Sequence, residues 1–194
     1  MFYGNTLFQP VVIKTAFGYD DADEDDEFGN LVKNIRDSMI LSIIALPGYF
    51  VSVALIGRRV CFKHIQTPRY IQMQGFAIMA ILYSIISFTW DDLTQHHWLL
   101  VMLYGSTFFF SNYGPNTTTF MLPSITFSPD CRSTLNGISA ASGKAGALLG
   151  SIMFEPIANK YGDAMVMFLC ALTSVCGGVI TAYCVRPPRR VGTS

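Results

Sequence analysis

Long uncharged stretches are the feature that most limits the folds open to this 194-residue chain. Ser38–Gly57 contains no charged side chain, and neither do Tyr70–Trp90 or Ala164–Val185. A helix needs about 20 mostly apolar residues to cross a hydrocarbon core about 30 Å thick. Charged residues make up 13% of the chain, whereas a soluble domain carries about 25%. The sequence therefore predicts an all-α fold, a polytopic membrane helical bundle without a separate soluble domain.

The other apolar segments extend this bundle to six helices. Leu93–Pro129 is uncharged and long enough for one helix and part of a loop, whereas Ser133–Phe154 carries one charge, on Lys144. The opening stretch is a weaker helix, because Pro10 and Lys14 interrupt it. We expect a single membrane domain over 1–194, with helices at about 2–18, 35–57, 70–90, 98–121, 134–157 and 164–185.

Charges in the connecting segments predict how the bundle is oriented. The run YDDADEDDE over 19–27 holds seven acidic residues, so we expect a solvated acidic loop over 19–30. The loops at 58–69 and 122–135, together with the tail at 186–194, hold eight Lys and Arg residues. Lys and Arg near helix ends mark the cytoplasmic side of a membrane protein. We therefore expect the 19–30 loop outside the cell and the C-terminal tail in the cytoplasm.

Composition and spacing argue against several classes of function. The chain has 13 Lys and Arg against 13 Asp and Glu, which indicates no nucleic-acid partner. Its five cysteines show no CxxC spacing, so we expect neither a zinc site nor a disulfide framework. Gly137–Lys144 resembles a phosphate-binding loop, but the glycine spacing is wrong and Ala145 replaces the required Ser or Thr. We expect no enzyme, no metal site and no cofactor.

The segment Asn112–Lys144 places unusually polar sequence at membrane depth. Pro115 removes a helix hydrogen bond and frees backbone groups near Asn116. Small residues from Gly137 to Gly150 form a face that lets helices approach closely. An ionisable side chain such as Lys144 is costly inside a membrane and usually faces a partner or a watery path. These features indicate helices that line a cavity.

The same residues resemble a known family. GPNTTTF (Gly114–Phe120), followed by RSTLNGISAASGK, resembles the tenth and eleventh helices of proton-coupled phosphate symporters of the major facilitator superfamily. FYGNTLFQ (Phe2–Gln9) is similar to the middle of the seventh helix in that family, and Pro47–Phe76 to the eighth and ninth. The resemblance implies the C-terminal six-helix half of a twelve-helix eukaryotic carrier for inorganic phosphate and protons.

This resemblance also implies where the substrate binds. Carriers of this fold hold substrate near the bilayer midplane between two pseudo-symmetric halves. By resemblance, Tyr3 and Asn116 would hydrogen-bond the phosphate, and Lys144 would supply charge for the anion or for proton coupling. The chain would then need its N-terminal six-helix half as a partner, and its location would be the plasma membrane.

Some family features are absent from this chain. The Trp and Asp that precede the matching tyrosine in the seventh helix have no counterpart before Tyr3. In PSITFSPDCR, Ile125 replaces a Glu and Asp130 replaces an Arg, and only Arg132 is kept. Two alternatives therefore stay open: a facilitator carrier for another substrate, such as a sugar or an organic anion, and a non-transporting regulatory or truncated membrane protein.

The predicted orientation can be tested by cysteine labelling from outside intact cells. A cysteine introduced by Asp25→Cys should react with an impermeant thiol reagent, because position 25 lies in the outer acidic loop. The Arg190→Cys variant should stay unlabelled until the cells are permeabilised, since the basic tail faces the cytoplasm. The reverse labelling pattern would contradict the orientation.

Overall fold

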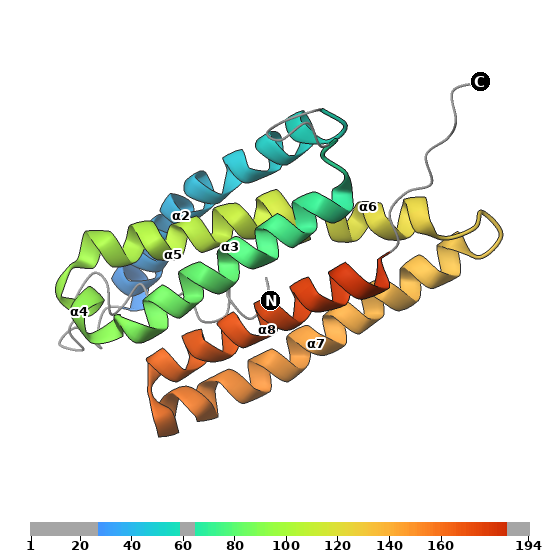
Figure 1. The fold of residues 1–194 in the computed structure, drawn as a ribbon. Coiled ribbons are helices and arrows are strands. Elements are labelled where there is room, and N and C mark those ends of the chain that lie inside the picture. The colour runs from blue at the N-terminus through green and yellow to red at the C-terminus, as the bar shows by residue number, and fades with distance from the viewer. Residues whose placement is uncertain (1–26, 59–64, 186–194) are drawn as a thin grey trace.

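In a computed structural model, the described residues, 27–58 and 65–185, form a bundle of helices (Figure 1). The all-α membrane bundle predicted from the sequence is confirmed, whereas the predicted helix at 2–18 and the tail at 186–194 lie outside the described residues. In chain order the elements are α2 (Glu27–Leu55), α3 (Pro68–Phe88), α4 (Trp90–Gln95), α5 (His97–Ser111), the π-helix η2 (Asn112–Asn116), α6 (Thr117–Thr126), α7 (Arg132–Tyr161) and α8 (Asp163–Cys184).

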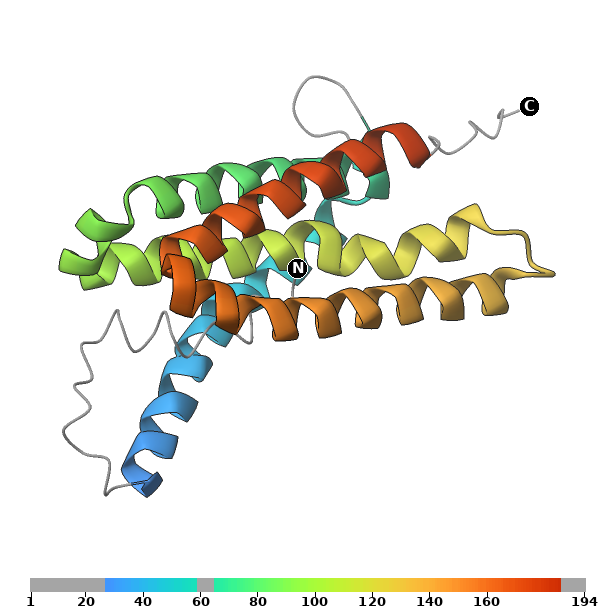
Figure 2. The ribbon, with the colours of Figure 1, turned by 90° about the horizontal axis from the view of Figure 1, so that it is seen from below.

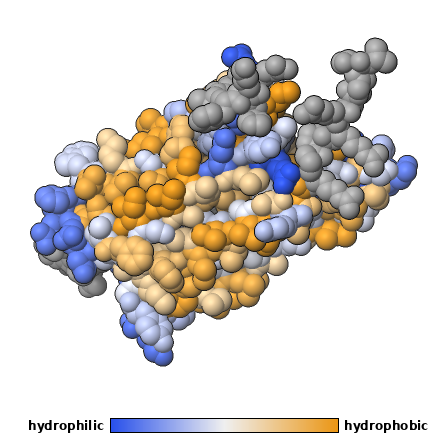
Figure 3. Space-filling model, in the orientation of Figure 1, coloured by the Kyte–Doolittle hydropathy of each residue, from blue (hydrophilic) through white to orange (hydrophobic). Residues whose placement is uncertain are grey.

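Apolar length is what suits these helices to a bilayer. Among the described residues, Leu31–Leu55, Pro68–Phe88 and Asp163–Cys184 are each long and apolar enough to cross a membrane. Helices α5, η2 and α6 follow one another with no residues between them. The region predicted as a helix at about 98–121 is therefore one continuous helical path that contains a π-turn. Hydrophilic residues gather toward the ends of the bundle and apolar residues cover much of the surface between them (Figure 3). This pattern is typical of a protein surrounded by lipid.

The helices pack in an antiparallel arrangement around α3. Helix α8 lies along α3, and α7 lies beside α8 at the edge of the bundle, whereas α2 slants away from the other helices (Figures 1 and 2). At one end, the side chain of Arg69 donates a 2.5 Å hydrogen bond to the carbonyl of Ala182 in the last turn of α8. At the other, the Ser87 hydroxyl bonds the carbonyl of Ala164. These two bonds tie the ends of α3 to the ends of α8.

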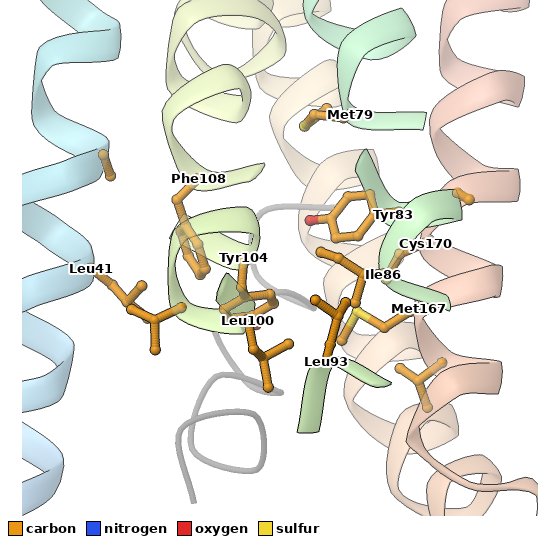
Figure 4. Close-up of a cluster of buried hydrophobic side chains, with 14 residues drawn as sticks. Leu41, Met79, Tyr83, Ile86, Leu93, Leu100, Tyr104, Phe108, Met167 and Cys170 are labelled. Carbon is orange, nitrogen blue, oxygen red and sulfur yellow. The ribbon is translucent and has the colours of Figure 1, made fainter. Parts of the chain in front are cut away.

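A hydrophobic core fills the space between α2, α3, α5 and α8 (Figure 4). It is built from side chains spaced one helical turn apart, as expected for helices that bury a single face. Tyr83 and Tyr104 are its largest fully buried side chains. The other labelled members are Leu41, Met79, Ile86, Leu93, Leu100, Phe108, Met167 and Cys170.

Two close helix crossings hold η2 in place. A Cβ atom added at Gly75 of α3 would lie 2.6 Å from the Cα atom of Gly114 and 2.8 Å from Cδ of Pro115, so the two backbones are in direct contact. On the other side, a Cβ atom at Gly48 of α2 would collide with the carbonyl oxygen of Phe109 in α5 and would lie 3.1 Å from the backbone nitrogen of Tyr113 in η2. Only glycine permits this separation. The π-turn is therefore held between α2 and α3.

Several helix ends differ from the sequence-based prediction. Helix α2 begins at Glu27 instead of about residue 35, so residues 27–30, which the sequence places in the acidic loop, form its first turn. Helix α6 continues to Thr126, and α7 spans Arg132–Tyr161 instead of about 134–157. The 30 residues of α7 extend over about 45 Å, more than the hydrocarbon core requires. Apolar length alone marks the part of a helix that lies in lipid and misses polar turns that continue beyond it.

The crossing of α3 and η2 predicts that Gly75→Ala destabilises the bundle. The added methyl group meets backbone atoms that cannot rotate away, and overpacking of this kind costs about 1–3 kcal/mol. For a chain of this size we expect the thermal midpoint of the purified protein to fall by about 3–10 °C. The measurement is thermal unfolding in detergent, followed by tryptophan fluorescence.

Gly143→Ala is the matched control, because a Cβ atom there meets nothing within 4 Å among the described residues. Its midpoint should stay the same or rise slightly, since alanine favours helix. Equal losses in both variants would contradict the close crossing.

Candidate functional site

The break in the long helix comes from Pro115 and is stabilised by three neighbouring threonines. A proline inside a helix cannot donate its backbone hydrogen bond, and π-turns of this type are common at functional sites. The next turn supplies hydroxyl groups that donate to carbonyl oxygens of the break. The bonds run from Thr117 to the carbonyl of Asn112 (2.6 Å), from Thr118 to that of Gly114 (2.9 Å) and from Thr119 to that of Pro115 (2.5 Å). The TTT sequence therefore satisfies backbone acceptors at the π-turn.

A chain of side-chain hydrogen bonds joins η2 to α2. Asn112, which is buried, donates from Nδ2 to the carbonyl oxygen of Ala45 at 3.0 Å. Asn116 donates from its own Nδ2 to Oδ1 of Asn112 at 2.8 Å and to the phenol oxygen of Tyr49 at 3.0 Å. Tyr49 is 38% exposed, so this chain leads from the buried interior to an accessible phenol.

A second set of polar contacts joins the π-turn to α3. The Thr118 hydroxyl lies 3.2 Å from Oε1 of Gln72, and both side chains are buried. The phenol of Tyr113 donates to Oε1 of Gln74 at 2.7 Å. Polar groups inside a membrane are costly unless they are paired. These bonds give the break a fixed geometry.

The predicted site residues fall in different places. Asn116 lies at the centre of the hydrogen-bond chain, whereas Lys144 is exposed on α7 and takes no part in it. Tyr3 lies outside the described residues. Along their helix axes, Asn116 lies about 15 Å from the end of α6, and Lys144 about 18 Å from the start of α7. The 127–131 connection joins these two helix ends, so Asn116 and Lys144 lie at similar depths.

Helix α7 presents an open face. None of its residues is buried, and Cβ atoms added at Gly137, Gly143 or Gly146 would meet nothing within 4 Å among the described residues. The sequence predicted that these small residues allow close helix contact. Within the described part of the chain, close backbone contacts are made instead by Gly48 and by Gly75 with Gly114, and Gly177 lies against the ring of Phe76.

Tyr49 and Asn112 belong to the candidate site but were not predicted from the sequence. Asn112 precedes Asn116 by one helical turn, and side chains at this spacing lie on one face of a helix. That spacing could have indicated the pair. Tyr49 belongs to a different helix, and only the tertiary fold brings its phenol to Asn116. Within residues 27–58 and 65–185, no three His, Cys, Asp or Glu side chains are close enough to share a metal ion.

Comparison with known proteins identifies the family. The sequence profile of the sugar (and other) transporter family matches residues 2–187. The chain belongs to this family. It is therefore an integral membrane protein of the major facilitator type, in agreement with its apolar helices.

Individual members with curated names narrow the resemblance. The chain is 35% identical to "Probable inorganic phosphate transporter 1-6" of Arabidopsis thaliana, over 93% of this chain and 34% of that protein. It is 37% identical to low affinity inorganic phosphate transporter 5 of Petunia hybrida, over 77% of this chain and 28% of the relative. For low affinity inorganic phosphate transporter 4 of Lotus japonicus, the identity is 34%, over 91% of this chain and 33% of the relative. This transporter-family chain thus spans about a third of the length of the curated relatives that it matches.

The hydrogen bonds of the Thr118 hydroxyl predict that Thr118→Val destabilises the folded helix bundle. Valine has nearly the same shape but lacks the hydroxyl that meets both Gly114 and Gln72, and leaving a buried polar group unpaired costs about 1–3 kcal/mol. We expect the thermal midpoint to fall by about 3–10 °C.

The control for this variant is Thr173→Val in α8. The Thr173 hydroxyl also bonds a carbonyl of its own helix, but its side chain is exposed. Its effect should stay within about 0.5 kcal/mol. Equal destabilisation by Thr118→Val and Thr173→Val would contradict the proposed stabilisation of the π-turn by the Thr118 hydroxyl.

Proposed function

We propose that this chain forms the C-terminal six-helix half of a proton-coupled inorganic phosphate symporter. The observation that carries the proposal is the hydrogen-bonded chain of Tyr49, Asn116 and Asn112 at the π-turn, at a depth similar to that of Lys144. The similarity to proteins named inorganic phosphate transporters supports phosphate as the substrate.

The chemistry of these residues suits a small anion. Neutral amide and phenol groups form hydrogen bonds with phosphate without holding it permanently, and one ammonium group offsets part of its charge. In the proposed site, Asn116 and Tyr3 contact phosphate, and Lys144 supplies the positive charge or takes part in proton coupling. The substrate lies near the bilayer midplane, where alternating access requires one half to rock against the other.

The exposed face of α7 supports a partner half. Lys144 and the small residues of α7 lie on a face that no described helix covers. Exposing such polar groups to hydrocarbon costs several kcal/mol for each unsatisfied group. We propose that a six-helix N-terminal half covers this face in the lipid bilayer of the plasma membrane, with the C-terminal tail in the cytoplasm.

A carrier for a sugar or an organic anion is the second candidate, because the matching family profile includes sugar carriers. Competition experiments separate the two functions. Arsenate should inhibit uptake by a phosphate carrier, whereas sugars should not. Inhibition by sugars alone would favour the second candidate.

Transport should require both halves of the carrier. We expect the 194-residue chain in liposomes to show no saturable phosphate uptake under an inward proton gradient, because it supplies one wall of the site. Co-reconstitution with a matching N-terminal half should produce gradient-dependent uptake. Uptake by the single chain would refute the need for a partner, and a lack of uptake by the pair would refute phosphate transport.

Within the paired carrier, Lys144→Ala should abolish coupled uptake while leaving the amount of protein in the membrane unchanged. Lys160→Ala is the control, since Lys160 lies in the last turn of the same helix, far from the midplane. Wild-type uptake in Lys144→Ala would leave that lysine with a structural role only.

A further inference from the structure

The direction of each hydrogen bond in the Tyr49–Asn116–Asn112 chain can be deduced from its buried end. The carbonyl oxygen of Ala45 can only accept, so Asn112 must present its Nδ2 to that oxygen. Oδ1 of Asn112 then faces Asn116 and requires a donor, which places Nδ2 of Asn116 there. The orientation of both amides is therefore fixed by a backbone group on α2.

Both N–H groups of Asn116 are consumed by this arrangement. One is bonded to Asn112 and the other to the oxygen of Tyr49, so neither is left for a substrate. The amide of Asn116 then offers only its Oδ1 atom, which accepts hydrogen bonds. Asn116 is half-buried, which leaves room for such a contact.

Tyr49 takes the opposite role. Its phenol oxygen accepts from Asn116, and its single O–H group stays available to donate. The side chain is 38% exposed, and no hydrogen bond from this O–H to another described residue is found. A donor that is itself polarised by a chain of hydrogen bonds is a good partner for a negatively charged oxygen.

We propose that Tyr49 and Asn116 form a donor–acceptor pair that selects a protonated tetrahedral oxyanion. The inference rests on the proposed function and deepens it. The Tyr49 O–H donates to a charged oxygen of the anion, and Oδ1 of Asn116 accepts from a P–OH group. Both ionisation states that phosphate adopts near neutral pH keep such a group, and so do those of arsenate, whereas sulfate has none.

This pairing gives a physical basis for specificity. A site that is built to bond a substrate hydroxyl rejects an analogue that lacks it, because the acceptor is then left unpaired against a negatively charged oxygen. The nearby Tyr113 does not compete for this role. It is nearly buried, and its O–H is already bonded to Gln74.

The test uses the wild-type chain paired with its N-terminal half in liposomes, with phosphate uptake as the readout. Tyr49→Phe keeps the ring and removes only the hydroxyl. Loss of a hydrogen bond to a charged group should raise KM for phosphate at least about tenfold, with the maximal rate changed far less. Tyr183→Phe in α8 is the matched control, because Tyr183 is exposed and lies outside the π-turn, and its KM should stay within about twofold of wild type.

Competing oxyanions test the acceptor role. Arsenate should inhibit phosphate uptake by the wild-type pair, whereas sulfate at about tenfold excess should not. In Asn116→Ala, the preference for phosphate over sulfate should narrow. Membrane abundance of every variant is measured in parallel, so that a folding defect is not read as a loss of affinity.

The outcomes separate the two claims. An unchanged KM in Tyr49→Phe, or an equal rise in Tyr183→Phe, would overturn the donor role while wild-type uptake still supports phosphate transport. Sulfate inhibition as strong as that by arsenate would overturn the acceptor role of Asn116. A wild-type pair without phosphate uptake would overturn both the proposed function and this inference.

Discussion

The backbone contact between Gly75 and Gly114 is the constraint from which most of the described structure follows. It brings α3 directly against the π-turn, while Gly48 brings α2 against the same turn from another side. Because no side chain separates these segments, short polar groups can bridge them inside an otherwise apolar bundle. A larger residue at either crossing would separate the helices and break the bonds that reach across them.

The threonine hydroxyls and the asparagine amides at the π-turn have different functions. The hydroxyls of Thr117, Thr118 and Thr119 donate to backbone carbonyls and so stabilise a break that would otherwise expose unsatisfied acceptors. The amides of Asn112 and Asn116 form a hydrogen-bond chain that leads from the buried carbonyl of Ala45 to the phenol of Tyr49. A site with fixed donor and acceptor positions binds a substrate without first paying to order its own side chains.

The open face of α7 supports the proposal that the carrier has a second half-bundle. Among the described residues, α7 adds only partly buried side chains to the core, and it carries a central lysine and a row of small residues. The same features suit a helix that faces a cavity and a second half-bundle. The chain spans between 27% and 34% of the length of the first three curated relatives.

The sequence by itself determined the class of structure. Uncharged runs such as Ser38–Gly57 require helices in lipid, and GPNTTTF with GISAASGK indicated the transporter family that the profile match confirmed. Pro115 also indicated a break near Asn116, because a missing backbone donor is a local property of the chain. Helix ends were less predictable, as the early start of α2 at Glu27 shows, because polar turns beyond the membrane leave no hydropathy signal.

Only the tertiary structure decided how the polar residues are used. The atoms that meet at the π-turn come from α2, α3 and η2, which are far apart in the sequence. By family resemblance, Asn116 hydrogen-bonds phosphate, and this contact stays a prediction. Its neighbours occupy both of its N–H groups and leave it as an acceptor, with Tyr49 as the available donor. The direction of a hydrogen bond depends on the group across the interface, and in this chain that group is a backbone carbonyl on another helix.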